Sequence, residues 1–181
     1  MRLHEQLGSA TAILALAVPL WSIGLGPAET RAEERQADAI AALFDLDGEP
    51  VGSVTFFALP HGTLLHARLT GMPVGAHAFH VHETGICEPP FDSAGGHYDP
   101  DDAAHGFVAE DGYHAGDFPN IHVPATGRLE VEFFSTALVL DERLFDEDGA
   151  SVVIHAEPDD YVSQPAGDAG PRIACGVIEP A

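Results

Sequence analysis

The sequence contains no lysine, and its seven basic residues are all arginine. Against them stand 29 acidic residues, which gives a net charge of −22. Proteins bind nucleic acid and anionic membrane surfaces through lysine and arginine side chains that neutralise phosphates. The composition therefore argues against a nucleic-acid partner and against binding to a membrane surface.

Cysteine is also scarce, since the chain has only Cys87 and Cys175. This count excludes a disulfide-dense scaffold and leaves open either one disulfide or two free buried thiols. No stretch beyond residue 38 shows the long apolar period of a helix. The length of 181 residues and the 45% hydrophobic content predict one domain with a packed core. Eleven histidines in such a chain point to metal or proton chemistry.

Residues 1–32 have the pattern of a signal peptide. Arg2 gives a weakly positive start, residues 7–25 are mostly apolar, and small residues follow, so that cleavage is expected after Ala28 or Ala32. A retained membrane anchor is the alternative, because the apolar stretch approaches the length that spans a bilayer. Export would place the domain of residues 33–181 in a periplasmic or extracellular compartment, where the two cysteines can pair.

Short apolar runs separated by Gly, Pro and Asp turns predict a β protein from residue 39 onward. The Asp47-Gly48 pair is typical of a hairpin between the first two runs. This rhythm is broken by two long connections, residues 84–119 and 157–172. Many short strands with regular turns favour an all-β sandwich or barrel, with strands expected at 39–46, 50–58, 63–70, 76–83, 128–138, 150–156 and 173–178.

Two histidines share one face of a predicted strand. In Phe79-His80-Val81-His82 the side chains of His80 and His82 point to one face while Phe79 and Val81 point to the core. Two adjacent imidazoles make half of a metal site. Taken alone, they also fit a solvent-exposed strand face.

The first long connection carries a denser set of potential ligands. Three histidines and an aspartate lie within 21 residues of Gly-rich chain, and their donors match the tetrahedral preference of zinc: His97, His105, His114 and Asp117. Scattered surface histidines are the alternative. His155 ends a β-branched run, and on its own it fits a structural residue equally well.

The chain resembles the copper/zinc superoxide dismutases of the secreted bacterial type. The resembling blocks are residues 77–83, 94–100, 105–106, 114–120, 152–156 and 170–178. The resemblance covers residues 38–179 and implies an eight-stranded Greek-key β-sandwich, or flattened barrel, with two long functional loops.

The resemblance also implies a role for each site residue. His80, His82, His97 and His155 would hold copper, and His97, His105, His114 and Asp117 would hold zinc, with His97 bridging the two ions. Arg172 would guide superoxide to the copper, and His97 would act in catalysis. Asp159 would link His80 to His105, and Cys87 and Cys175 would form a disulfide.

The implied activity converts two superoxide anions and two protons to dioxygen and hydrogen peroxide. A periplasmic copper- and zinc-binding or storage module with little turnover is the alternative. A zinc-only structural protein is disfavoured, because His80, His82 and His155 would then have no reason to converge. Relatives associate through different surfaces and some stay single, so a homodimer stays open.

The chain departs from the common family pattern at several positions. Tyr98 and Asp99 stand where a Phe-Asn pair is more common, and Ala78 stands where Gly is usual. The connection 157–172 lacks the lysine often found there. None of these changes removes an expected ligand.

Overall fold

The computed structural model describes residues 35–110 and 112–181. The expected signal peptide, residues 1–32, lies outside the described residues. Across the part of the chain that is described, no helix is long and apolar enough to cross a membrane.

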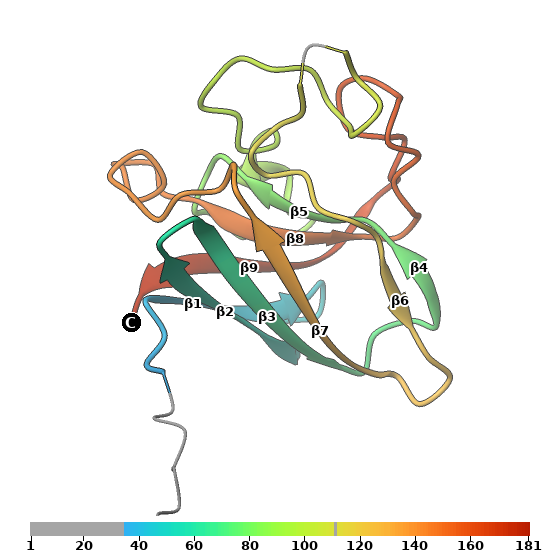
Figure 1. Ribbon diagram of the computed structural model, residues 1–181. Helices are drawn as coiled ribbons and strands as arrows, with labels where there is room; N and C mark the ends of the chain where they lie inside the picture. Colours follow the sequence, from blue (N-terminus) through green and yellow to red (C-terminus); the bar gives the residue numbers. More distant parts are fainter. Residues whose placement is uncertain (1–34, 111) are drawn as a thin grey trace, which may run out of the picture. The chain divides into compact units, whose positions relative to one another are not determined.

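The domain is all-β, as expected (Figure 1). Seven strands form one antiparallel sheet in the order β5-β8-β9-β1-β2-β3-β7. Two short strands, β4 and β6, pair in a second sheet. The strand bounds are β1 Ala39–Asp45, β2 Pro50–Leu59, β3 Gly62–Thr70, β4 Gly75–His77, β5 Phe79–His82, β6 Ile121–Val123, β7 Arg128–Ser135, β8 Ser151–His155 and β9 Arg172–Pro180.

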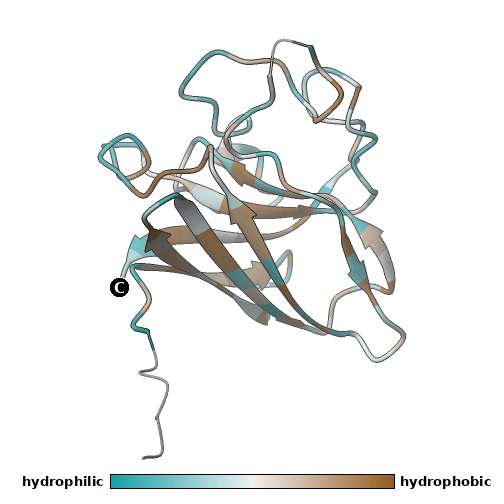
Figure 2. Cartoon of the chain, in the orientation of Figure 1, coloured by the Kyte–Doolittle hydropathy of each residue, from teal (hydrophilic) through white to brown (hydrophobic). Residues whose placement is uncertain are grey.

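Alternation along the strands builds the core. On β1, Ala39, Ala41 and Leu43 are fully buried, whereas Ile40 and Phe44 face outward. A period of two is the pattern of a sheet with one face in the core and one toward solvent. Figure 2 shows the apolar residues concentrated on the strands and the hydrophilic ones on the connections.

The run 76–83, expected as one strand, is divided at Ala78. The main chain of Ala78 leaves the β4 register and bonds instead to the neighbouring segment, with its N–H donating to Glu157 O and its carbonyl accepting from His155 N. The first part of the run then pairs with β6 and the second part with β8. The described residues consequently hold nine strands where the resemblance implied eight.

β5 and β8 are buried on both faces, unlike β1. One face of β8 contributes Val152 and Ile154 to the main core. On the other face Val153 packs with Phe91, Ala94 and Cys175 in a second apolar cluster. The long connection after β5 therefore covers the outer face of these strands. The expected disulfide joins this connection at Cys87 to β9 at Cys175.

We predict that Cys87→Ser destabilises the domain by about 2–5 kcal/mol, because the disulfide closes a long loop and restricts the unfolded chain. The two cysteines are 88 residues apart. Urea unfolding of oxidised protein measures the effect. The double variant Cys87→Ser/Cys175→Ser serves as control and should lose the same amount. An unchanged unfolding midpoint in both variants would contradict the prediction.

Candidate metal centre

Three histidines converge on the outer face of β5 and β8. His80 and His82 lie two residues apart on β5, and antiparallel pairing brings the end of β8 beside them. The Nε2 atoms of His82 and His155 are 3.4 Å apart. All three rings are buried. His80 and His82 therefore lie on the same face of β5, as predicted. This face is covered by a loop and is not exposed to solvent.

The long connection reaches this face by pairing with the edge of β5. Val81 N donates to Gly116 O at 2.9 Å, and Tyr98 N donates to Val81 O at 2.8 Å. Gly116 is required at this close approach, because a Cβ there would lie 2.2 Å from Val81 O. These main-chain bonds set His97 and Asp117 beside the strand histidines.

Two groups of ligand atoms result, and they share His97. Within each group the available ligand atoms all lie within 4.8 Å of one another. Among the described residues these are the groups in which three or more such side chains converge, and every member is buried: His80, His82, His97 and His155 in the first, and His97, His105, His114 and Asp117 in the second.

Two ring nitrogens facing the first group have no hydrogen-bond partner, namely His80 Nδ1 and His97 Nε2. The other nitrogen of each ring is occupied, since His80 Nε2 is 2.8 Å from Asp159 Oδ2 and His97 Nδ1 is 2.8 Å from Asp117 Oδ1. A buried polar atom without a partner is unfavourable unless something binds it. The orphaned nitrogens fit a metal ion held by imidazoles.

The second group surrounds one carboxylate oxygen. The Nδ1 atoms of His97, His105 and His114 lie 2.8, 3.1 and 3.3 Å from Asp117 Oδ1. The other oxygen, Oδ2, accepts the N–H groups of Gly106 and His114. Three imidazoles and a carboxylate held by the main-chain N–H groups of Gly106 and His114 match the donor set of a four-coordinate zinc site.

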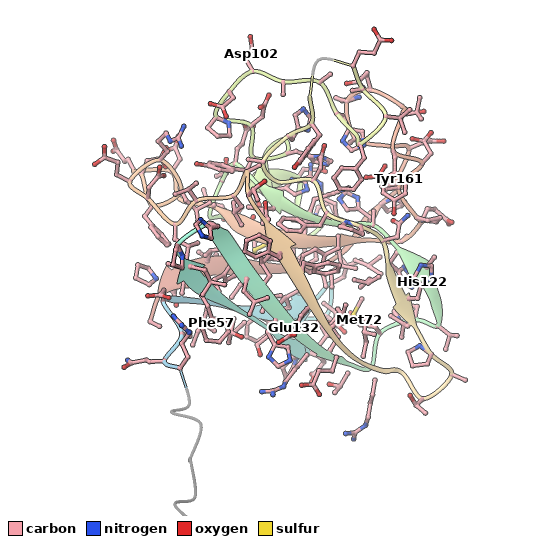
Figure 3. The ribbon with its side chains drawn as sticks, viewed as in Figure 1. Phe57, Met72, Asp102, His122, Glu132 and Tyr161 are labelled. Carbon is pink, nitrogen blue, oxygen red and sulfur yellow. A yellow bond between two sulfur atoms is a disulfide. The ribbon has the colours of Figure 1, made fainter. Side chains whose placement is uncertain are left out.

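Asp159 connects the two groups. Its carboxylate lies 2.8 Å from His80 Nε2 and 3.1 Å from His105 Nε2. The Asn120 side chain bonds to both main-chain polar groups of Asp159, with Nδ2 donating to Asp159 O and Oδ1 accepting from Asp159 N. Tyr161 N donates to Asp159 Oδ1, and the Tyr161 hydroxyl accepts from Asn120 N. Figure 3 shows Tyr161 among the loops of this end and His122 apart from them on β6.

The roles of Asn120 and Tyr161 were missed by the sequence reasoning. Asn120 belongs to a block that resembles the family, which was the one available signal for it. Tyr161 has no motif around it, because its contact depends on two loops meeting. His77 takes no part in either group, since its ring is buried with Nδ1 2.9 Å from His155 O and Nε2 3.0 Å from Pro73 O.

The pKa values of the histidines are shifted in opposite directions within this site. Burial lowers the pKa of His97 to about 4 and that of His155 to about 3, so both rings are neutral, as metal ligation requires. For His105 burial acts in the same direction, but hydrogen bonds with Asp117 and Asp159 outweigh it and raise its pKa to about 9. The field of these two carboxylates favours a cation in the second group.

Arg172 begins β9 opposite His155, with which it pairs after a register shift in the β8–β9 ladder. Its guanidinium donates to two main-chain carbonyls of the long connection, Nη1 to Phe91 O at 2.5 Å and Nη2 to Gly95 O at 2.6 Å. Burial lowers its pKa, yet a guanidinium stays charged at any physiological pH. A fixed positive charge therefore stands beside the first group.

For protein stripped of metal with a chelator, we predict a maximum of stability near pH 6.5, the ordinary histidine value. Below pH 6.5, His97 and His155 bind protons in the unfolded chain but stay neutral in the folded one, so the free energy of unfolding falls toward pH 4. Above it, folded His105 keeps a proton that the unfolded chain releases, so stability falls toward pH 9. Urea unfolding at pH 4.5, 6.5 and 9 measures this. A stability that only rises across the series would contradict it.

Comparison with known proteins agrees with this geometry. Residues 51–178 match the family model described as copper/zinc superoxide dismutase (SODC). A superoxide dismutase [Cu-Zn] of Aquifex aeolicus is 43% identical over 146 residues, which cover 77% of this chain and 85% of that protein.

Two solved structures share the fold. A SOD-like protein from Bacillus subtilis has a TM-score of 0.72 and 34% identity, over 76% of this chain and 96% of that one. The Cu/Zn superoxide dismutase from Brucella abortus has a TM-score of 0.65 and 30% identity, over 78% of this chain and 99% of that one. With its two histidine groups, its disulfide and a family match over most of its domain, the chain belongs to the copper/zinc superoxide dismutase family.

Proposed function

We propose that this protein carries out the activity of its family at the two buried groups, converting two superoxide anions and two protons to dioxygen and hydrogen peroxide. The observation that carries the proposal is the pair of ligand sets joined by His97, with unpartnered nitrogens on the side of the first set. Moving an electron between two superoxide anions needs a redox-active group, and copper is the redox-active one of the family's two metals, copper and zinc.

The donor types support one assignment of the two metals. Imidazole suits both oxidation states of copper, whereas a carboxylate among three imidazoles suits zinc. The copper ligands would be His80, His82, His97 and His155. The zinc ligands would be His97, His105, His114 and Asp117. Copper held by these residues would supply one-electron redox chemistry, which zinc cannot supply.

His97 is suited to hold and release a proton at Nε2. Its Nδ1 is engaged by the second group, at 2.8 Å from Asp117 Oδ1, which fixes the ring. Its Nε2 faces the first group without a partner. Since the reaction consumes two protons, a ring anchored on one side and free on the other provides a fixed point for proton delivery.

Arg172 would bind and orient the substrate. Superoxide is an anion, and a protein of charge −22 repels it at long range. The guanidinium held by Phe91 O and Gly95 O provides a local positive charge beside the first group. A storage module has no need for an anion-binding charge in this position, which favours turnover over storage.

The proposal includes export, with residues 1–32 removed and residues 33–181 active in the periplasm or outside the cell. The disulfide supports an oxidising compartment. The charge of −22 supports a chain that binds neither nucleic acid nor anionic membrane surfaces.

The test is the decay of a pulse of superoxide in the presence of the chain loaded with one copper and one zinc. A second-order rate near the diffusional ceiling of about 10⁸–10⁹ M⁻¹s⁻¹ is the expected result. A rate no higher than that of the same amount of copper on an unrelated protein would reject the catalytic proposal and favour a storage module.

We predict that Arg172→Gln lowers this rate at least tenfold, because it removes the positive charge beside the copper ligands. The matched control is Arg128→Gln, which makes the same change in net charge at an exposed position at the start of β7. Equal losses in the two variants would show that total charge governs the rate and would contradict a local role.

We predict that Asp159→Asn weakens binding of both metals by about 10–100-fold, the range found when a partner of a ligating histidine is removed. An amide has one acceptor oxygen and cannot serve both His80 Nε2 and His105 Nε2. Competition with a chelator measures the two affinities. Glu157→Gln, an exposed change two residues away, is the control. Unaltered affinities in Asp159→Asn would contradict the linking role.

A further inference from the structure

Among the members of the two groups, His105 differs in how its main chain is held. His114 forms a turn with Asp117, since its carbonyl accepts from Asp117 N at 3.0 Å. His105 lies outside every helix and strand, and no main-chain group of the described residues bonds to its main chain. The other members lie in β5 or β8 or pair with β5 through isolated bridges: His80, His82, His155, His97 and Asp117.

The side chain of Gln164 provides the support that a strand provides elsewhere. Its Oε1 accepts from His105 N at 2.9 Å, and its Nε2 donates to His105 O at 2.9 Å. A side-chain amide suits this position because it carries an acceptor and a donor side by side. His105 is fully buried, and a buried main-chain donor or acceptor without a partner is unfavourable. One side chain therefore satisfies both main-chain polar groups of His105.

Gln164 is itself held in place by the segment around it. Residues 160–167 close on themselves, because Asp160 N donates to Gly167 O at 3.0 Å and Gly167 N donates to Ser163 O at 2.7 Å. Asp160 Oδ1 accepts from Val162 N and Ser163 N. Gln164 Nε2 also donates to Val162 O at 3.2 Å. The amide thus comes from a segment whose shape is fixed by its own hydrogen bonds.

The two long connections are in main-chain contact beside this amide. Gly106 follows His105 and lies against Tyr161 O, where a Cβ on Gly106 would be 2.2 Å from that oxygen. Tyr161 precedes Gln164 by three residues. Residues 161–164 therefore hold His105 and Gly106 from the side of the second connection.

The ring contacts of His105 orient it without fixing its main chain. Its Nδ1 lies 3.1 Å from Asp117 Oδ1, and its Nε2 lies 3.1 Å from Asp159 Oδ1. A zinc ion binds imidazole nitrogen at about 2.0–2.1 Å, so a small displacement of the residue weakens the bond. The distance from His105 Nδ1 to the other donors then depends on where the main chain is anchored.

We propose that Gln164 is a positioning residue of the second group, which holds the main chain of His105 where its Nδ1 can bind zinc. The amide bonds to main-chain atoms of His105 and not to its ring, so it acts through that residue. The inference rests on the proposed function only in taking zinc as the ion of the second group.

The variant Gln164→Met tests the proposal, because it removes both hydrogen bonds at similar side-chain length and without a change of charge. Competition with a chelator measures the zinc and copper affinities of the loaded protein. We expect the zinc affinity to fall about tenfold, the lower end of the range for partners of ligating histidines. The copper affinity should change less. Equal weakening of both metals would indicate a general loosening of the site and would overturn the proposal.

Two controls separate the amide from its surroundings. Gln36→Met makes the same change at an exposed position near the start of the described residues. Ser163→Ala removes the hydrogen bond from Ser163 Oγ to Asp160 Oδ2 in the same segment and leaves the Gln164 amide in place. Both variants should retain the zinc affinity of the parent. A loss in Ser163→Ala as large as that in Gln164→Met would overturn the specific role of the amide.

Hydrogen exchange of single amides gives a readout that does not depend on affinity or turnover. It is measured by NMR on the loaded protein with its copper kept reduced and diamagnetic by ascorbate. We expect His105 N–H to exchange faster in Gln164→Met than in the parent, while His114 N–H, which bonds to Asp117 Oδ2, is unchanged. Unchanged exchange at His105, or faster exchange with the zinc affinity of the parent, would overturn the proposal.

These readouts also separate the inference from the proposed function. A chain that shows the expected zinc affinities and exchange rates but does not accelerate the decay of superoxide would reject the proposed function and leave the role of Gln164 intact. A chain that is active, with the same zinc affinity in Gln164→Met as in the parent, would reject the role of Gln164 alone.

Discussion

The pairing of the long connection with the edge of β5 is the interaction on which the site depends. Val81 is the centre of this contact, since its N–H bonds to Gly116 O and its carbonyl accepts from Tyr98 N. The strand alone provides two histidines on one face. The pairing adds His97 on one side and Asp117 on the other, and it covers the rings from water. Both ligand groups, their burial and the lowered histidine pKa values follow from this contact.

Much of the fold could be predicted from local pattern. Alternation on β1 and the two histidines on β5 follow from the period of a strand, and the sequence alone indicates them. The break at Ala78 could not be predicted in this way, because it arises from hydrogen bonds to residues almost 80 positions later. The site divides similarly. The members of its two groups could be named from motifs, whereas the contacts of Asn120 and Tyr161 depend on how two loops meet.

The net charge of the protein and the charge beside the first group have opposite signs. The 22 excess negative charges repel an anion at long range, whereas the positive charge of Arg172 is held beside the first group by two main-chain carbonyls.

The shared position of His97 has a thermodynamic consequence. With an ion in each group, a ring shared by both would couple the two binding equilibria. If the first ion changes the affinity for the second by some factor, the second ion must change the affinity for the first by the same factor. The metal specificity of each group would then depend on the ion in the other group. A wrong ion in one group would also change the affinity of the other group for its ion.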